Sequence, residues 1–298
     1  MKYHDILRGF ILLAFIGLVS SACEKLGEEL DEDWLQKVEI TQDFKVKQIY
    51  SIGNGVENNY QGYTGQGVAV RDKVMYRLYN HGLCQTYDVS DLANPSKIAS
   101  FELGSHQASN HSNCAQFYAD ENGDALLYVS GLKGGKTYVE RVTPSGSTLI
   151  QTITLSKTAV LNQTVALNAV CGDDGNLWYF GSGGNKLLFA KARRPLISEG
   201  DVILGENDIL DYWIEDGFVY DDDVWQGGKV YGNLLFFLFG ATGSKAHLAV
   251  YDTRAHERIL DIDLSDVIHK EPEDCELIPE GILIVTNGGS NYYLVKPK

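Results

Sequence analysis

Four short strand-like segments follow one another in residues 113–155, which read NCAQFYADENGDALLYVSGLKGGKTYVERVTPSGSTLIQTITL. The segments are residues 113–117, 126–130, 137–142 and 148–155. Asn, Asp and Gly residues lie between them, and these residues readily adopt the backbone angles of tight hairpin turns. The last segment, TLIQTITL, alternates apolar and polar residues, as a half-buried strand does. The stretch therefore predicts a four-stranded antiparallel unit.

This unit recurs along the chain. An apolar triplet follows a turn at five places: Val74-Met75-Tyr76, Leu126-Leu127-Tyr128, Leu177-Trp178-Tyr179, Leu234-Leu235-Phe236 and Ile282-Leu283-Ile284. The last residues of successive triplets are 52, 51, 57 and 48 positions apart. Four-stranded repeats of this length are typical of β-propeller blades. Since few long stretches have helical periodicity, we expect an all-β fold.

The last repeat lacks a fourth strand, because only residues 275–278, 282–285 and 292–295 are strand-like before the sequence ends. Residues 44–52, which precede the first repeat, resemble the fourth strands at residues 97–103 and 149–155. We expect a strand at about residues 43–53 to complete the last blade, since this leaves no long unpaired sheet edge. The sequence thus predicts a five-bladed β-propeller as a single domain over residues 43–298. A sixth blade would have to fit within residues 186–225, which are too few for two blades.

The N-terminal segment has the pattern of an export signal. Lys2 and Arg8 precede an apolar run at residues 9–19, and three small residues then lead to Cys23. The run is too short for a comfortable membrane span, so residues 1–22 are interpreted as a signal peptide. The alternative is an ordinary signal peptide with an incidental cysteine at its end.

The cysteine after small residues resembles a bacterial lipoprotein cleavage site, which implies that Cys23 is lipidated and joins the chain to a lipid bilayer. The acidic residues 23–42 would then form a tether between the lipid and the propeller. Acidic residues directly after such a cysteine also resemble a surface-export signal of the Bacteroidetes. We therefore expect an exported lipoprotein of the outer membrane, and both the periplasmic and the cell-surface orientation stay open.

Charge excludes one class of partner. The chain has 40 acidic and 25 basic residues and a formal net charge of −15. Because affinity for phosphate comes mainly from Lys and Arg, we do not expect nucleic acid to be a partner.

The propeller repeats resemble a group of uncharacterised Bacteroidetes lipoproteins with propeller folds. The resemblance covers most of residues 60–298 and rests on His111-Ser112-Asn113, residues 126–130 with Val139-Glu140-Arg141, Gln226-Gly227-Gly228 and Glu271-Pro272-Glu273. In the last motif the related pattern continues with Gly, where this chain has Asp274. The resemblance implies the fold and the location, and it implies no reaction.

The loops that lead from an outer strand to the next inner strand should gather on one face of a propeller, around its axis. Candidate ligand-binding residues in these loops are Tyr63, His106, His111, Asn162, Asp223, Trp225, Gln226 and Glu273. Polar side chains that orient a ligand and aromatic rings that cover its apolar surface are what a small-molecule or sugar site requires. The alternative is a set of solvated loops around a water-filled pore.

Metal binding is a further hypothesis for the same loops. Asp221, Asp223, Glu271 and Glu273 offer hard oxygen ligands that suit calcium, although no cofactor is required by the pattern. Residues 120–124 and 173–176 resemble half of a calcium loop and are better interpreted as hairpin turns. We expect Cys84, Cys114, Cys171 and Cys275 to be free buried thiols, because Cys114 and Cys275 fall at similar places in inner strands of non-neighbouring blades. No two of the four have the spacing of a metal site.

Two classes of function follow. The first is a binding or interaction module for a small molecule, a glycan or a protein. The alternative is a glycoside hydrolase of the five-bladed type, with Asp223, Glu273 and Asp274 as the channel carboxylates. The absence of a carboxylate where the first inner strand begins, at Gln66 and Gly67, weakens that alternative. A calcium-dependent hydrolase is a third hypothesis. An enzyme predicts two carboxylates about 5–10 Å apart in one pocket, at least one with a raised pKa.

Overall fold

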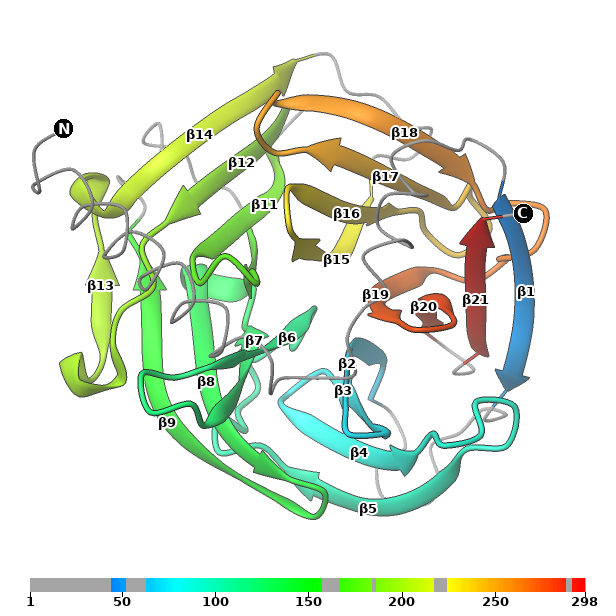
Figure 1. Cartoon of the computed structure of the whole chain (residues 1–298), viewed down its shortest axis with the longest axis horizontal. Coiled ribbons are helices and arrows are strands. Elements are labelled where there is room, and N and C mark those ends of the chain that lie inside the picture. The colour runs from blue at the N-terminus through cyan, green and yellow to red at the C-terminus, as the bar shows by residue number, and fades with distance from the viewer. Residues whose placement is uncertain are drawn as a thin grey trace, which may run out of the picture.

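The fold is a ring of five sheets around a central axis (Figure 1), in a computed structural model of the chain. The structure describes residues 44–51, 63–156, 167–183, 186–216, 224–287 and 291–297. Each sheet contains four antiparallel strands placed side by side from the axis outward, and one sheet has a fifth strand at its outer edge. The predicted all-β, five-bladed propeller is therefore confirmed.

The blades are numbered in chain order, and their strands are given from the axis outward. Blade one contains β2 (Gly65–Arg71), β3 (Val74–Tyr79), β4 (Leu83–Asp88) and β5 (Ser96–Glu102). Blade two contains β6 (Ala115–Ala119), β7 (Ala125–Ser130), β8 (Lys136–Thr143), β9 (Gly146–Leu155) and β13 (Val202–Leu204). Blade three contains β10 (Asn168–Cys171), β11 (Leu177–Gly183), β12 (Lys186–Ala192) and β14 (Ile209–Asp216). Blade four contains β15 (Trp225–Tyr231), β16 (Leu234–Phe239), β17 (His247–Asp252) and β18 (Glu257–Asp263). Blade five contains β19 (Pro272–Ile278), β20 (Gly281–Thr286), β21 (Asn291–Pro297) and β1 (Phe44–Ser51).

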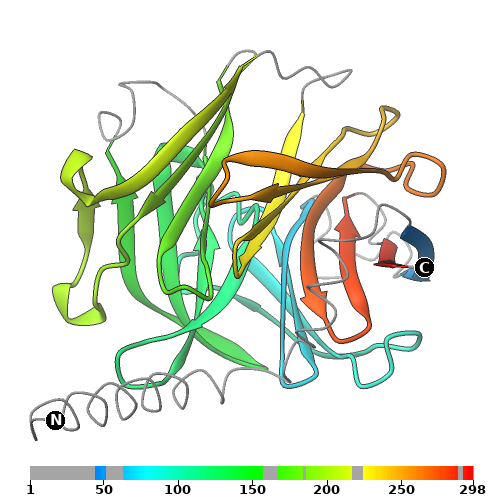
Figure 2. The same ribbon diagram turned by 45° about the horizontal axis from the view of Figure 1, so that its top comes forward.

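The ring closes between the two ends of the propeller sequence. Strand β1 pairs antiparallel with β21, so that Val46 lies opposite Val295. Figure 1 shows β1 on the outside of the blade whose three inner strands come from the end of the chain. Phe44 and Val46 pack against the core shared by blades four and five. The closure predicted from the N-terminal strand is confirmed, and Figure 2 shows the same ring from an inclined direction.

The segment between β12 and β14 differs from the simple repeat. It contains two short 3-10 helices, η2 (Ile197–Glu199) and η3 (Glu206–Asp208), with β13 between them. Strand β13 leaves blade three and pairs in parallel with β9 of blade two. Residues 186–216 thus complete blade three and extend blade two, so no sixth blade forms there. A third short 3-10 helix, η1 (Lys133–Gly135), connects β7 to β8.

The core lies between neighbouring blades. A cluster of buried apolar side chains fills each of the five blade interfaces. Cys84, Cys114, Cys171 and Cys275 are buried and not joined by disulfides, as expected. In the part of the chain that the structure describes, no helix has the length and hydropathy of a membrane span.

Candidate functional site

The starts of the inner strands and the ends of the second strands lie at the same end of the propeller axis. Because neighbouring strands within a blade are antiparallel, each inner strand begins at the end of the molecule where the second strand finishes. We call this end of the axis the mouth. It corresponds to the face on which the sequence predicts a ligand site.

The inner strands of three adjacent blades are irregular at the mouth. Their register shifts lie between Gly65 and Val68 in β2, between Trp225 and Gly228 in β15, and between Pro272 and Asp274 in β19. Gln66, Gln226 and Glu273 lie within these three irregularities, and we call them the bulge triad. A β-bulge redirects side chains and often occurs beside functional sites. The three blades therefore present one polar side chain each from the same structural position.

Gln226 begins a chain of hydrogen bonds across the mouth. Its Nε2 donates to Glu271 Oε1 at 2.7 Å and to the carbonyl oxygen of Gly240 at 2.9 Å. Asn287, which follows β20, donates through Nδ2 to the other carboxylate oxygen of Glu271. Both oxygens of Glu271 thus accept a hydrogen bond from a side-chain amide, and blades four and five are joined at the mouth.

Glu273 is the buried carboxyl of the bulge triad. Its residue is only 2% exposed, and burial raises its pKa well above the usual value for glutamate. The nearby carboxylate of Glu271 raises this pKa further, while Arg77 and a hydrogen bond from Asn287 lower it. The carboxyl groups of Glu271 and Glu273 therefore lie close together at the mouth.

Arg77 of β3 stabilises the irregular start of β2. It is fully buried, and its guanidinium donates to the carbonyl oxygens of Gln66 and Gly67, the latter at 3.1 Å. It also donates to the carbonyl oxygen of Thr286 in blade five, at 2.8 Å. Gly65 leaves the space for this side chain, because a Cβ there would lie 2.2 Å from Nη2 of Arg77. Arg77 therefore positions the bulge through the backbone.

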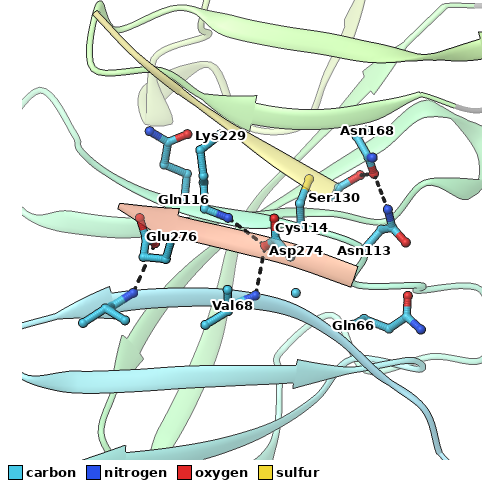
Figure 3. Close-up of polar contacts among 12 residues, drawn as sticks. Gln66, Val68, Asn113, Cys114, Gln116, Ser130, Asn168, Lys229, Asp274 and Glu276 are labelled. Atoms are coloured by element: carbon cyan, nitrogen blue, oxygen red, sulfur yellow. Dashed lines mark hydrogen bonds and ion pairs between the residues drawn. The ribbon is translucent and has the colours of Figure 1, made fainter. Parts of the chain in front are cut away.

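A sealed group of charges lies farther along the axis (Figure 3). Lys229 Nζ and Asp274 Oδ2 form an ion pair at 2.7 Å, and both side chains are completely buried. Asp274 Oδ2 also accepts a hydrogen bond from the backbone N–H of Val68 at 2.9 Å. Glu276 accepts one from the N–H of Val70 at 3.2 Å and another from the hydroxyl of Tyr231 at 2.5 Å. Blades four, five and one are thus joined by polar side chains.

The protonation of this group follows from its burial. Burial raises the pKa of Asp274 to about 6 and that of Glu276 to about 7, and Lys229 opposes the shift in both. The two carboxylates raise the pKa of Lys229 to about 12, against the effect of its own burial. Lys229 is therefore charged at neutral pH, and it faces two carboxyl groups.

Other side chains connect the remaining blades across the axis. Gln116 of blade two donates to the carbonyl oxygen of Val230 in blade four at 2.8 Å and accepts from its N–H at 3.3 Å. Asn113 donates to Asn168 Oδ1 at 2.8 Å, and Asn168 in turn donates to the carbonyl oxygen of Gln226 at 2.6 Å. We call Asn113, Gln116, Asn168, Lys229, Asp274 and Glu276 the axial network. All six residues are buried, so beyond the mouth hydrogen-bonded side chains connect blades across the axis.

The predicted site residues fall into three groups. Gln226, Glu271 and Glu273 come together at the mouth, as described above. Tyr63 packs edge-on against His81 with 5.1 Å between the ring centres. Burial lowers the pKa of His111, and the charges of Lys133 and His81 lower it further. His111 therefore lies near His81, the histidine that Tyr63 contacts.

The second group lies apart from these contacts. His106 is exposed and lies 4.0 Å from Glu102. Trp225 is half-buried and packs against the core between blades three and four. The third group, Asn162, Asp221 and Asp223, lies outside the described residues, as does Cys23.

The calcium hypothesis depends partly on that third group. Within the described ranges, no three His, Cys, Asp or Glu side chains gather in a group that could hold a metal ion. Asp221 and Asp223 are not among the residues searched.

Three participants were missed at the sequence level. Arg77 lies in a second strand and Asn287 after one, outside the loops that the repeat pattern singles out. Gln66 was noted only for the lack of a carboxylate nearby. The useful signal was the recurrence of Gln before Gly in residues 66–67 and 226–227, at the same place in two blades.

Comparison with known proteins supports the fold. No protein-family model and no curated protein matches the chain. The tail fibre of Staphylococcus aureus phage P68 is similar in structure, with a TM-score of 0.50 and 13% identity over 88% of this chain and 56% of the fibre chain. An exo-β-1,3-galactanase from Clostridium thermocellum has a TM-score of 0.45 and 11% identity, over 84% of this chain and 61% of the enzyme. A protein of unknown function from Bacteroides caccae has a TM-score of 0.40 and 10% identity, over 76% and 72%.

These likenesses concern the fold only, because the identities are low. The chain spans little more than half the length of the tail fibre and about three fifths of that of the galactanase. The tail fibre, at a TM-score of 0.50 and 13% identity, is similar to this chain in fold.

Proposed function

We propose that this protein is a ligand-binding module whose site is the mouth of the propeller. The observation that carries the proposal is the bulge triad. Three adjacent blades depart from regular pairing at equivalent positions and there present Gln66, Gln226 and Glu273 above an axis occupied by the axial network. Regular strands would serve a purely structural propeller equally well, whereas bulges that redirect polar groups suit recognition.

The ligand in this proposal is a small molecule, a glycan or an exposed group of a protein. Tyr63 and His81 would contribute apolar ring surface beside the polar triad. We further propose that the propeller is exported and held at the outer membrane by a lipid on Cys23. The basic, apolar and small-residue pattern of the first 22 residues supports this location.

A binding screen tests the proposal. Glycan arrays and thermal-shift screening of metabolites, each with and without Ca²⁺, are expected to reveal a ligand of the wild-type protein. Replacing Gln226 by Leu removes the hydrogen bond that positions the Glu271 carboxylate at the mouth, and this loss of positioning should weaken ligand binding at least about tenfold.

The matched control is Gln48→Leu, because Gln48 is an exposed glutamine on β1, the outermost strand of blade five. Equal affinity of the two variants for every ligand found would contradict the mouth as the binding site.

The second candidate is a glycoside hydrolase, and the specific observation in its favour is Glu273. A buried carboxyl with a raised pKa beside a second carboxylate, Glu271, is the environment of a general acid. Asp274, which the sequence suggested as a partner, is sealed against Lys229, and we propose a structural role for it. Reducing sugar released from a polysaccharide panel, and its loss in Glu273→Gln, would support this candidate. Binding of the same polysaccharides without hydrolysis would favour the first.

A further inference from the structure

Most of the side-chain hydrogen-bond donors at the mouth already donate to acceptors of the protein itself. Gln226 uses its amide on Glu271 and Gly240, and Asn287 uses its own on Glu271. The terminal nitrogens of Arg77 donate to three backbone carbonyls, which leaves only its buried Nε without a partner among the described residues. A ligand rich in acceptors would therefore find few donors there.

One hydrogen-bond acceptor at the mouth, in contrast, has no donor from the described part of the chain. Gln66 is 4% exposed, and its Oε1 has no hydrogen-bond partner within the described ranges. Its Nε2 already donates to Thr64 Oγ1 at 3.1 Å. The neighbouring Gly67 donates its N–H to the carbonyl oxygen of Ser112 at 2.9 Å, so the start of β2 lies against the segment that contains Asn113, at the mouth (Figure 3). A buried acceptor without a donor is unfavourable, so a ligand donor would be favourable at this point.

Charge points in the same direction. Glu271 and Glu273 lie close together with Arg77 as a neighbouring cation. The sealed group farther along the axis adds the carboxyl groups of Asp274 and Glu276 to the charge of Lys229. Burial favours the neutral form of Glu273 in the free protein, and a bound cation would favour its carboxylate form, which would then accept a hydrogen bond from that cation. The cation would also donate to the Oε1 of Gln66 that lacks a donor among the described residues. Calcium takes 6–8 oxygen ligands, many more than an ammonium group, which needs two or three acceptors.

We infer that the mouth recognises a ligand through an ammonium or guanidinium group, with Glu273 and Gln66 as its acceptors. The two residues occupy the same bulge position in adjacent blades five and one. Arg77 and Asn287 would position them. This inference rests on the proposed binding function and adds the chemical class of the ligand.

The test uses matched fragments that differ only in one group. Amine, alcohol and carboxylate versions of three skeletons serve as probes: cyclohexylamine, cyclohexanol and cyclohexanecarboxylate; benzylamine, benzyl alcohol and benzoate; glucosamine, glucose and glucuronate. Ligand-observed NMR titration of the full propeller gives their affinities, and Ca²⁺ alone is a separate arm. At least one amine is expected to bind about tenfold or more tightly than its alcohol, with no binding of the carboxylate.

Two variants and one control connect this preference to the mouth. Glu273→Gln keeps the shape of the side chain and should weaken amine binding about tenfold, and Gln66→Leu should weaken it as well. Glu280→Gln makes the same change of charge at an exposed turn at the opposite end of blade five and should have no effect. Thermal melting of each variant shows that it is folded.

The inference is overturned if amines and alcohols bind equally, if Ca²⁺ alone occupies the site, or if Glu273→Gln and Glu280→Gln behave alike. If the broad screen yields a neutral or anionic ligand that depends on Gln226, the proposed function stands and only the ligand class is wrong. If neither screen yields a ligand that depends on the mouth, both fail.

Discussion

Gly227 sets how closely the inner strands of three blades approach at the axis. A Cβ at this position would lie 2.6 Å from Asp274 Oδ1 and from the carbonyl oxygen of Glu273, and 2.9 Å from that of Asn113. Two of these three atoms belong to backbone, which cannot move without disturbing a blade. We therefore expect Gly227→Ala to lower the free energy of unfolding by about 1–3 kcal/mol, as overpacking does. Urea denaturation followed by tryptophan fluorescence measures the change.

Gly146 provides the control for this substitution. It lies at the start of β9, and its Cβ would meet only Thr143 Oγ1, at an ordinary distance of 3.8 Å. Gly146→Ala should change the free energy of unfolding by less than about 0.5 kcal/mol. If the two variants were equally stable, the close approach at the axis would not limit side-chain size.

Strand β1 is the element on which ring closure depends. Two of its apolar side chains, Phe44 and Val46, are half-buried against blades four and five. A chain that begins at residue 52 loses both, so its free energy of unfolding should fall by about 2–4 kcal/mol relative to a chain that begins at residue 43. The shorter chain should also associate more readily, since β21 would become an open sheet edge.

Urea denaturation and light scattering of the two chains provide the measurements. The chain that begins at residue 43 is the matched comparison, because it lacks only the segment before β1. Equal stability of the two chains would mean that the fourth strand of blade five contributes little to closure.

At the level of elements, the sequence predicted the strands with clear hairpins and missed those shaped by tertiary contacts. The strand predicted at residues 126–130 is observed at Ala125–Ser130. The inner strand predicted at residues 275–278 begins three residues earlier, at Pro272. A register shift between Pro272 and Asp274 interrupts the pairing there, so the alternation pattern could not reveal this start. Strand β13 has three residues and exists because it pairs with β9, a contact that no local pattern encodes.

The stability of the whole molecule depends on pH through the ionisable side chains buried in the axial network. The pKa values of Asp274, about 6, and Glu276, about 7, lie above the ordinary values of 3.8 and 4.5. The folded state therefore binds more protons than the unfolded state between about pH 4 and pH 7. These two groups contribute stability that is complete below pH 4 and is lost as the pH rises through 6 and 7. Their contribution to the free energy of unfolding should consequently fall over this range.

Glu276→Gln isolates the contribution of one group. The difference in free energy of unfolding between wild type and variant should decrease as the pH rises from 4.5 to 7.5, by roughly 1.4 kcal/mol for each unit that the pKa exceeds its ordinary value. Urea denaturation at several pH values measures it, with Glu280→Gln as the exposed control. A difference that is independent of pH would show that Glu276 titrates as an exposed glutamate does.

The sequence by itself determined the all-β class, the four-stranded repeat and the strand that closes the ring. These features depend on local alternation and turn residues, which each segment carries in its own order of residues. Only the tertiary structure decided which polar residues meet at the axis. Gln66, Gln226 and Glu273 come from strands more than forty residues apart, and Arg77 reaches the backbone of Gln66 from a second strand. Their proximity depends on how five blades pack around one axis, and the turn and alternation patterns used to identify the blades do not specify this.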